Sequence, residues 1–155
     1  MRIISKSLAE TEKFAQDFLN KIKPKENDAT VVGLHGDLGS GKTAFVKLIA
    51  KNLGITENIT SPTFVIMKNY PLILQNFPTS KLPNFKTLTH IDAYRLDRGS
   101  DLAKLGFADL LNNQENLILL EWPEKVADVL PKDYVRIDFK FIDENTREIS
   151  TDFWL

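Results

Sequence analysis

The chain of 155 residues contains no cysteine and no clear excess of either charge. The absence of cysteine excludes disulfides, thiolate zinc sites and a cysteine nucleophile. Lys plus Arg number 20 and Asp plus Glu number 21, so no overall electrostatic field favours nucleic acid or an anionic membrane as a partner. If the protein takes part in RNA metabolism, we expect it to act on RNA only indirectly, through another protein.

Long apolar segments are also absent. The longest apolar runs have four residues, as in LILL at 117–120, whereas a membrane span needs about 20. The N-terminal segment MRIISKSLAETEKF lacks the apolar core of a signal peptide. We therefore expect a cytoplasmic protein with no membrane contact. The length supports one sizeable core but not two, which predicts a single domain over residues 1–155.

What the chain does contain is an alternation of strand and helix patterns. Ser7 and Glu10 match a capping box, which predicts that a helix begins there. The apolar face of this helix is expected to consist of Leu8, Phe14, Phe18, Leu19 and Ile22. Elsewhere the patterns predict strands at 2–5, 30–35, 64–70, 88–92 and 117–121, a helix at 42–54, one or two short helices at 101–112, and a hairpin around 143–145.

This order of elements predicts an α/β fold. The central sheet is expected to be mostly parallel, with the C-terminal hairpin forming an antiparallel edge. The strand at 117–121 is a continuous apolar run, so we expect it to be covered on both faces. Residues 71–87 contain three prolines and no clear period, which predicts a loop insertion.

A glycine-rich motif lies between the predicted strand at 30–35 and the predicted helix at 42–54. It fits G-x-x-x-x-G-K-[ST] without a gap and consists of Gly36, Asp37, Leu38, Gly39, Ser40, Gly41, Lys42 and Thr43. Glycines let backbone N–H groups surround a polyphosphate, and the start of the following helix adds its positive dipole end. Lys42 would contact the β- and γ-phosphates, and the Thr43 hydroxyl would bind Mg²⁺. The motif therefore predicts a P-loop NTPase-like, three-layer sandwich that binds a nucleotide with Mg²⁺.

Two acids follow predicted strands and are candidates to complete the magnesium site. Glu121 ends the apolar run at 117–121, and Asp92 ends the more polar strand at 88–92. Mg²⁺ takes one or two protein oxygens besides phosphates and water, and ligands collect at the carboxyl ends of strands in open α/β sheets. Spacing alone leaves open which acid would bind the metal and which would orient the attacking water. Each could also be an ordinary solvated acid.

The other polar or aromatic residues near these segments have two readings each. A hydroxyl in Thr60-Ser61-Pro62-Thr63-Phe64 could reach the γ-phosphate, or the stretch could be a simple turn into a strand. His90 and His35 are expected to be structural rather than catalytic. Trp122 is either a core residue or a wall of the site. Arg95 and Arg98 could contact phosphate, although a surface role is expected.

Five motifs together resemble those of the TsaE (YjeE) family. In chain order they are GDLGSGKT, SPTF, HIDAYRL, LLEWPEK and VLP, and the resemblance runs from about Ser7 to at least Arg136. Members of this family are small bacterial P-loop ATPases of tRNA threonylcarbamoyladenosine biosynthesis. The insertion at 71–87 is longer and richer in proline than the family pattern.

The resemblance implies an ATPase that works with TsaB and TsaD proteins to place threonylcarbamoyl on the adenosine beside the anticodon, at position 37, of tRNAs that read codons starting with A. It also implies roles for residues at matching positions. The residues from Gly36 to Thr43 would hold the phosphates, and Thr43 with Glu121 would hold Mg²⁺. Asp92 would be a second essential acid, and Thr63 would lie in a nucleotide-sensitive loop.

The resemblance gives a looser indication of where the base lies. The segment from Ser7 to Thr11 and the hairpin around Arg147 would both lie near it.

Two other functions fit a P-loop. A small-molecule kinase would need an acceptor pocket and usually an arginine-rich lid, for which Arg95 and Arg98 are the only neighbouring arginines found. A binding module that only changes shape with nucleotide would not need the two acids. A GTPase is disfavoured, because no N-K-x-D-like segment follows the P-loop.

Overall fold

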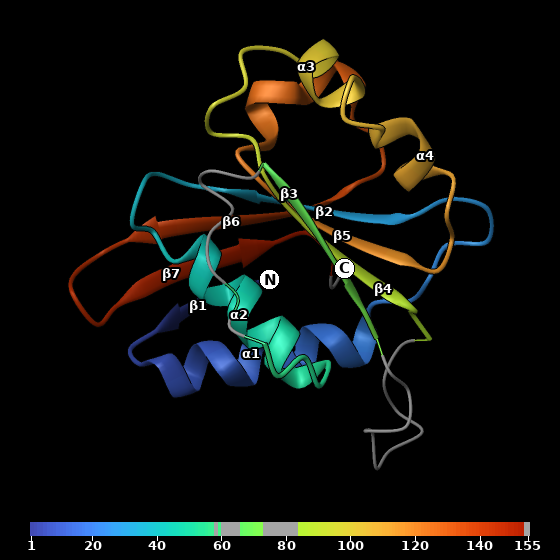
Figure 1. Ribbon diagram of the computed structural model, residues 1–155. Coiled ribbons are helices and arrows are strands. Elements are labelled where there is room, and N and C mark those ends of the chain that lie inside the picture. The colour runs from blue at the N-terminus through green and yellow to red at the C-terminus, as the bar shows by residue number, and fades with distance from the viewer. Residues whose placement is uncertain (58, 60–65, 73–83, 154–155) are drawn as a thin grey trace.

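The computed structural model describes residues 1–57, 59, 66–72 and 84–153. Its centre is a seven-stranded sheet with the order β1-β7-β6-β2-β5-β4-β3 (Figure 1). The strands are β1 (Arg2–Ser5), β2 (Thr30–His35), β3 (Met67–Pro71), β4 (Thr87–Asp92), β5 (Asn116–Glu121), β6 (Val135–Phe141) and β7 (Arg147–Thr151). The helices are α1 (Leu8–Lys21), α2 (Lys42–Asn52), α3 (Gly99–Ala103), α4 (Phe107–Leu111) and the 3₁₀ helix η2 (Pro123–Val129).

The sheet is parallel in its centre and antiparallel at both edges. Strands β6, β2, β5 and β4 run parallel, while β3 pairs antiparallel with β4, and β7 pairs antiparallel with β6 and β1. This confirms the predicted α/β fold with a parallel core and an antiparallel C-terminal hairpin. Strand β5 is buried at every position, as expected of a strand covered on both faces.

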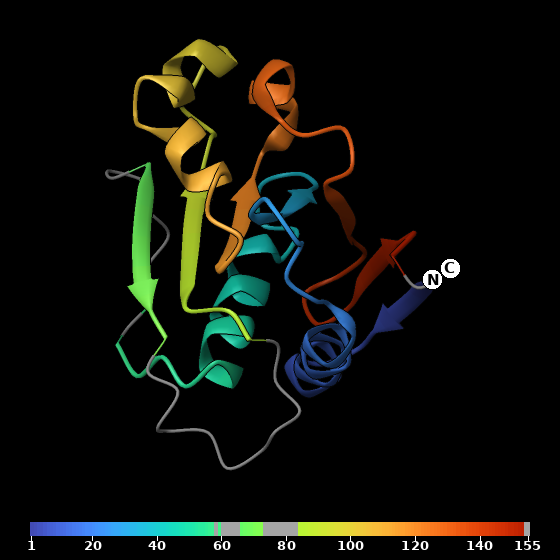
Figure 2. The same ribbon diagram turned by 90° about the vertical axis from the view of Figure 1, so that its right-hand side faces the viewer.

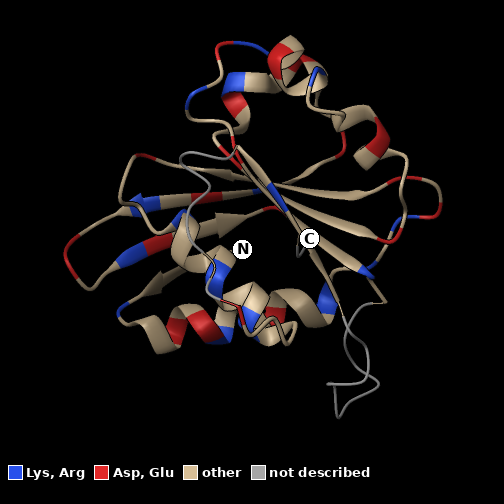
Figure 3. Ribbon diagram, viewed as in Figure 1, with Lys and Arg blue, Asp and Glu red and all other residues tan. Residues whose placement is uncertain are grey.

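Helices cover both faces of the sheet, which gives three layers (Figure 2). Helices α1 and α2 lie on one face, over a core that includes Phe18, Phe45 and Leu119. Helices α3, α4 and η2 lie on the other face, over a second core that includes Leu102 and Leu120. Acidic and basic segments are interspersed over these elements in the described part of the chain (Figure 3).

Helix α1 begins as the capping box predicts. The Ser7 hydroxyl accepts a hydrogen bond from the Glu10 N–H at 3.2 Å, and the Glu10 carboxylate accepts one from the Lys6 N–H at 2.7 Å. The prediction that Leu8 belongs to the apolar face is wrong, because its side chain is 63% exposed. The first turn of α1 lies over a pocket, not over the core, and the buried face starts at Thr11.

Several sequence predictions differ from the structure in extent; the predicted helix at 42–54, for example, ends at Asn52. The predicted short helices are two, α3 and α4, and the first of them begins at Gly99. Strand β3 begins at Met67, later than predicted, and the first two residues of the predicted strand, 64–65, lie outside the described residues. The segment 71–87 joins the antiparallel strands β3 and β4, and most of it, 73–83, lies outside the described residues.

Phe45 occupies the centre of the larger core. It is fully buried, and its ring lies 5.4 to 6.0 Å, between centroids, from the rings of Phe14, Phe18 and Phe139. We predict that Phe45→Ala lowers the free energy of unfolding by about 3–5 kcal/mol, because it leaves a cavity among these rings. Urea denaturation measures the change. The control Leu8→Ala should change it by about 0.5 kcal/mol or less, since Leu8 is exposed. Equal losses in the two variants would contradict this description of the core.

Candidate nucleotide and metal site

The P-loop lies at the carboxyl end of the central strand β2 and leads into α2. β2 pairs in parallel with β5 on one side and with β6 on the other. The loop therefore lies next to the carboxyl end of β5, where Glu121 is found, and close to β6. This is the edge of a parallel sheet at which ligands collect.

Two glycines of the loop occupy places that other residues could not. Gly36 has a φ of 135°, and a Cβ at this position would lie 2.2 Å from the carbonyl oxygen of Phe139 on β6. Gly41 has a φ of 111° and immediately precedes the first residue of α2. Both backbone conformations are costly for a residue with a side chain. These glycines therefore let the loop pack against β6 and turn directly into α2.

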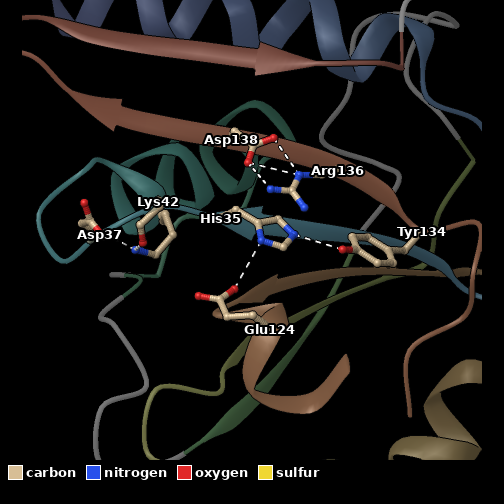
Figure 4. A network of polar contacts seen from close by, with 8 residues as sticks. His35, Asp37, Lys42, Glu124, Tyr134, Arg136 and Asp138 are labelled. Carbon is tan, nitrogen blue, oxygen red and sulfur yellow. Dashed lines mark hydrogen bonds and ion pairs between the residues drawn. The ribbon is translucent and has the colours of Figure 1, made fainter. Parts of the chain in front are cut away.

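Lys42 is the first residue of α2, and its side chain folds back over the loop (Figure 4). Its Nζ donates hydrogen bonds to the carbonyl oxygens of Gly36 at 2.6 Å and Asp37 at 2.9 Å. The same atom lies 4.2 Å from the centroid of the Trp122 ring. Burial lowers the pKa of Lys42, and the carboxylate of Glu121 opposes that shift. The cation is thus held inside the loop that is expected to receive phosphate.

The Thr43 hydroxyl contacts the acid at the end of β5. Thr43 Oγ1 donates to both carboxylate oxygens of Glu121, at 2.9 Å to Oε1 and 3.0 Å to Oε2. Glu121 is only 2% exposed. Asp92 ends the neighbouring strand β4 and pairs with Glu121 in the sheet register, so both acids stand at the same edge. Figure 1 shows this edge of the sheet close to the start of α2.

These oxygen groups suit Mg²⁺, which prefers hard oxygen ligands. In the part of the chain that the structure describes, no three His, Asp or Glu side chains are grouped so as to hold a metal ion by themselves. Thr43, Glu121 and Asp92 could supply part of an octahedral shell, with phosphate and water supplying the rest. The donor set therefore fits a magnesium ion that arrives with a nucleotide.

A cavity of about 400 Å³ opens between the P-loop and the two acids. Its lining residues are Leu38, Gly39, Gly41, Lys42, Thr43, Ala44, Asp92, Tyr94, Glu121, Trp122 and Arg147. Trp122 has a φ of 59°, a left-handed conformation that is unusual for a bulky residue. Its ring packs 5.0 Å from that of Tyr94, between centroids, and lies beside Lys42. The structure therefore supports both readings of Trp122, because it lines the cavity and also packs against the second core.

A second cavity, of about 200 Å³, lies on the other side of Gly41. Ser7 and Thr11 from α1 and Arg147 from β7 line it, together with apolar side chains from β6 and β7. Arg147 and Gly41 line both cavities. The structure thus places the start of α1 and the C-terminal hairpin on opposite sides of one pocket next to the P-loop. The nucleoside part of a nucleotide whose phosphates lie at the loop could occupy this pocket.

His35 ends β2 directly before the P-loop and takes part in a polar network (Figure 4). Its Nδ1 lies 3.3 Å from a carboxylate oxygen of Glu124, and its Nε2 lies 3.0 Å from the Tyr134 hydroxyl. Arg136 and Asp138 on β6 form an ion pair nearby, with a shortest distance of 2.6 Å. Burial, followed by the positive charge of Arg136, lowers the pKa of His35. His35 does not line either of the two cavities described above, and a structural role for it stays a prediction.

The structure brings most of the predicted site residues together. One cavity is lined by Leu38, Gly39, Gly41, Lys42, Thr43, Asp92 and Glu121, and Ser7 and Thr11 line the adjoining one. The other predicted P-loop residues, Gly36, Asp37 and Ser40, line neither cavity. Thr63 lies outside the described residues. Arg95 and Arg98 are exposed, and Arg98 lies 3.9 Å from Asp101, which agrees with a surface role.

Sequence reasoning missed two features of this site. Tyr94 lines the cavity, and the signal for it was its position two residues after Asp92, just past the end of a strand. His90 contacts Glu121 across two strands, and no spacing in the sequence indicates that contact. The Tyr94 N–H also donates to the Asp92 carboxylate at 3.0 Å, so the two residues share one tight turn.

Comparisons with known proteins agree with this description. Residues 5–149 match the family model described as "Threonylcarbamoyl adenosine biosynthesis protein TsaE". A TsaE protein of Rickettsia typhi is 37% identical over 139 residues, which cover 89% of this chain and 85% of the relative. One from Treponema pallidum is 33% identical over 150 residues, covering 97% and 98% of the two chains. The crystal structure of Bacillus subtilis YdiB superposes with a TM-score of 0.68 at 27% identity, and covers 97% of this chain and 83% of YdiB.

A gapless P-loop at the end of a central parallel strand, in a three-layer α/β fold, defines the class of P-loop nucleotide-binding proteins. Within that class, the chain belongs to the TsaE family. None of the helices in the described part is both long and apolar enough to cross a bilayer.

The lowered pKa of His35 gives a pH-dependent stability. Because the folded protein binds the His35 proton less readily than the unfolded chain does, stability is lost as pH falls below the ordinary value of 6.5 toward the folded pKa. We predict that the free energy of unfolding of the wild type, minus that of His35→Gln, decreases as pH is lowered from about 8 to 5. The pKa of Asp138 is lowered by Arg136, so its own contribution falls at more acidic pH. Urea denaturation measures both free energies. A difference between the wild type and His35→Gln that does not change with pH would contradict a lowered pKa of His35.

Proposed function

We propose that this protein binds ATP with Mg²⁺ and hydrolyses it as an accessory to threonylcarbamoyladenosine formation in tRNA. The observation that carries the proposal is the contact between Thr43 at the start of α2 and the buried Glu121 at the end of β5. A P-loop threonine that donates to a strand-end acid is what a site for nucleotide-bound magnesium requires. The names of the family and of its relatives support the tRNA modification pathway.

Each residue of the site has a proposed task. The phosphates are bound by the N–H groups of residues 36–43 and by the Lys42 ammonium. To reach them, the ammonium gives up its hydrogen bonds to the carbonyl oxygens of Gly36 and Asp37. Thr43 and Glu121 hold Mg²⁺, which when bound neutralises charge on the phosphate oxygens. Asp92, at the edge of the same cavity, orients the attacking water.

The base and ribose are proposed to occupy the second cavity. Ser7 and Thr11 offer hydroxyl groups there, and Arg147 reaches both this cavity and the one that contains the P-loop. Trp122 and Tyr94 close the phosphate side with aromatic rings and limit the access of water. In this arrangement the chain itself surrounds most of one nucleotide.

The proposed partners are TsaB-like and TsaD-like proteins, with tRNA contacted only through them. A net charge of −1 supports this, because a protein that bound tRNA directly would be expected to carry a basic surface. If ATP only switched the shape of the protein, adding these partners would leave the ATPase rate unchanged. An increase in rate on adding both partners is the expected result.

The P-loop lysine should be essential for turnover. We predict that Lys42→Ala lowers the rate of ATP hydrolysis at least about 100-fold, because a charge-stabilising donor to the phosphates is lost. Phosphate release without any added acceptor measures this, and would also distinguish an ATPase from a kinase. Lys47→Ala, an exposed lysine on the same helix, is the control and should leave the rate unchanged. Normal turnover by Lys42→Ala would reject the site.

The two acids should be needed for hydrolysis but not for folding. We predict that Asp92→Ala and Glu121→Ala each reduce ATP hydrolysis at least about 100-fold while the circular dichroism spectrum keeps its native shape. Asp97→Ala, an exposed acid five residues after Asp92, is the matched control. An unfolded spectrum for either variant would make that acid a structural residue.

The cellular role has a separate test. Nucleoside analysis of tRNA from cells depleted of this protein should show a loss of threonylcarbamoyladenosine. An unchanged level of this nucleoside would reject the pathway assignment and leave the ATPase proposal standing.

A further inference from the structure

His90 is a buried polar residue on a face of the sheet that is apolar except at its carboxyl edge, where Asp92 and Glu121 lie. Strand β4 alternates Leu88, His90 and Asp92 on the side covered by α1 and α2, and Leu88 is part of the larger core. In the register with β5, His90 pairs with Leu119, which belongs to the same core. His90 is 0% exposed, so a leucine would be the ordinary residue for this position.

The imidazole makes one hydrogen bond, and that bond goes to the proposed metal-binding acid. His90 Nε2 lies 2.9 Å from Glu121 Oε1. His90 Nδ1 is buried and has no hydrogen-bond partner among the described residues. Because a carboxylate accepts hydrogen bonds, the Nε2–H of His90 is the donor to Glu121. Burying a polar ring costs free energy unless it is satisfied, so Glu121 is the group that accounts for a histidine here.

We propose that His90 is a positioning residue that orients the Glu121 carboxylate for Mg²⁺. This rests on the proposed function, since it presumes that Glu121 binds the metal. The His90 N–H fixes Oε1, while Oε2 accepts a hydrogen bond from Thr43 alone among the described residues. The carboxylate is thus held between β4 and α2. Among the described residues, Oε2 accepts fewer hydrogen bonds than Oε1 does. Such supporting hydrogen bonds raise metal affinity by limiting how a ligand can turn.

Three substitutions separate this role from packing. In His90→Gln the side-chain N–H is separated from Cβ by the same number of bonds as Nε2 of the histidine. In His90→Asn the N–H is one bond closer to Cβ. His90→Leu fills the space but has no hydrogen-bond donor. Leu119→Ala, at the register neighbour of His90, is a control that weakens the core without changing the groups that hold the Glu121 carboxylate. Calorimetry with a non-hydrolysable ATP analogue gives the Kd in excess EDTA and in excess Mg²⁺, and the ratio of the two is the magnesium gain.

We expect His90→Leu and His90→Asn to lower the magnesium gain about tenfold while the Kd in EDTA stays close to that of the wild type. The magnesium gain of His90→Gln should be close to that of the wild type. Leu119→Ala should lower the melting temperature but leave the magnesium gain unchanged. If His90→Leu does not fold, the magnesium gains of His90→Asn and His90→Gln are compared, and a lower gain in His90→Asn supports the positioning role. Equal gains in the wild type, Asn and Gln proteins would overturn the positioning role. A wild type with no magnesium gain would instead reject the metal site of the proposed function.

Discussion

The hydrogen bond between Thr43 and Glu121 joins the parts of the molecule on which the site depends. It links the first turn of α2 to the carboxyl end of β5, and β5 is buried at every position between β2 and β4. The P-loop, the acids and the aromatic wall therefore share one rigid edge of the parallel sheet. A shift of β5 by one residue would turn Glu121 to the opposite face and leave the P-loop without its acid.

The site carries buried charge of both signs, and this shapes how it is held. Lys42 is 4% exposed and lies among backbone carbonyl oxygens and the face of Trp122, while Glu121 is held by two side chains. Charges taken from water need such partners, and their absence would cost several kcal/mol. The partners of Lys42 are neutral, so the phosphates of a nucleotide would replace them with a stronger interaction. Among the described residues, the hydrogen-bond acceptors of the Lys42 ammonium are backbone carbonyl oxygens, which an anionic ligand could replace.

Much of this could be predicted from local patterns. The P-loop, β2, α2, β5 and the two strand-end acids follow from glycine spacing and apolar runs, since each pattern reflects structure within a few neighbouring residues. The helical period predicts Leu8 on the apolar face wrongly, because a period does not reveal that the first turn of α1 lies over a pocket. The contact of His90 with Glu121 and the meeting of Ser7 with Arg147 depend on strand register and on the return of the C-terminal hairpin, which join residues 31 and 140 positions apart in sequence. Trp122, whose backbone is left-handed, lies between β5 and the proline that starts η2.

The most direct test of the central claim is a crystal structure with Mg²⁺ and a non-hydrolysable ATP analogue. The account predicts phosphates against the N–H groups of residues 36–43, Lys42 moved from the carbonyl oxygens of Gly36 and Asp37 onto them, and the metal between Thr43 and Glu121. The base should lie between α1 and the β6–β7 hairpin. A nucleotide bound elsewhere, or a Lys42 that keeps its contacts with the loop while nucleotide is present, would contradict it.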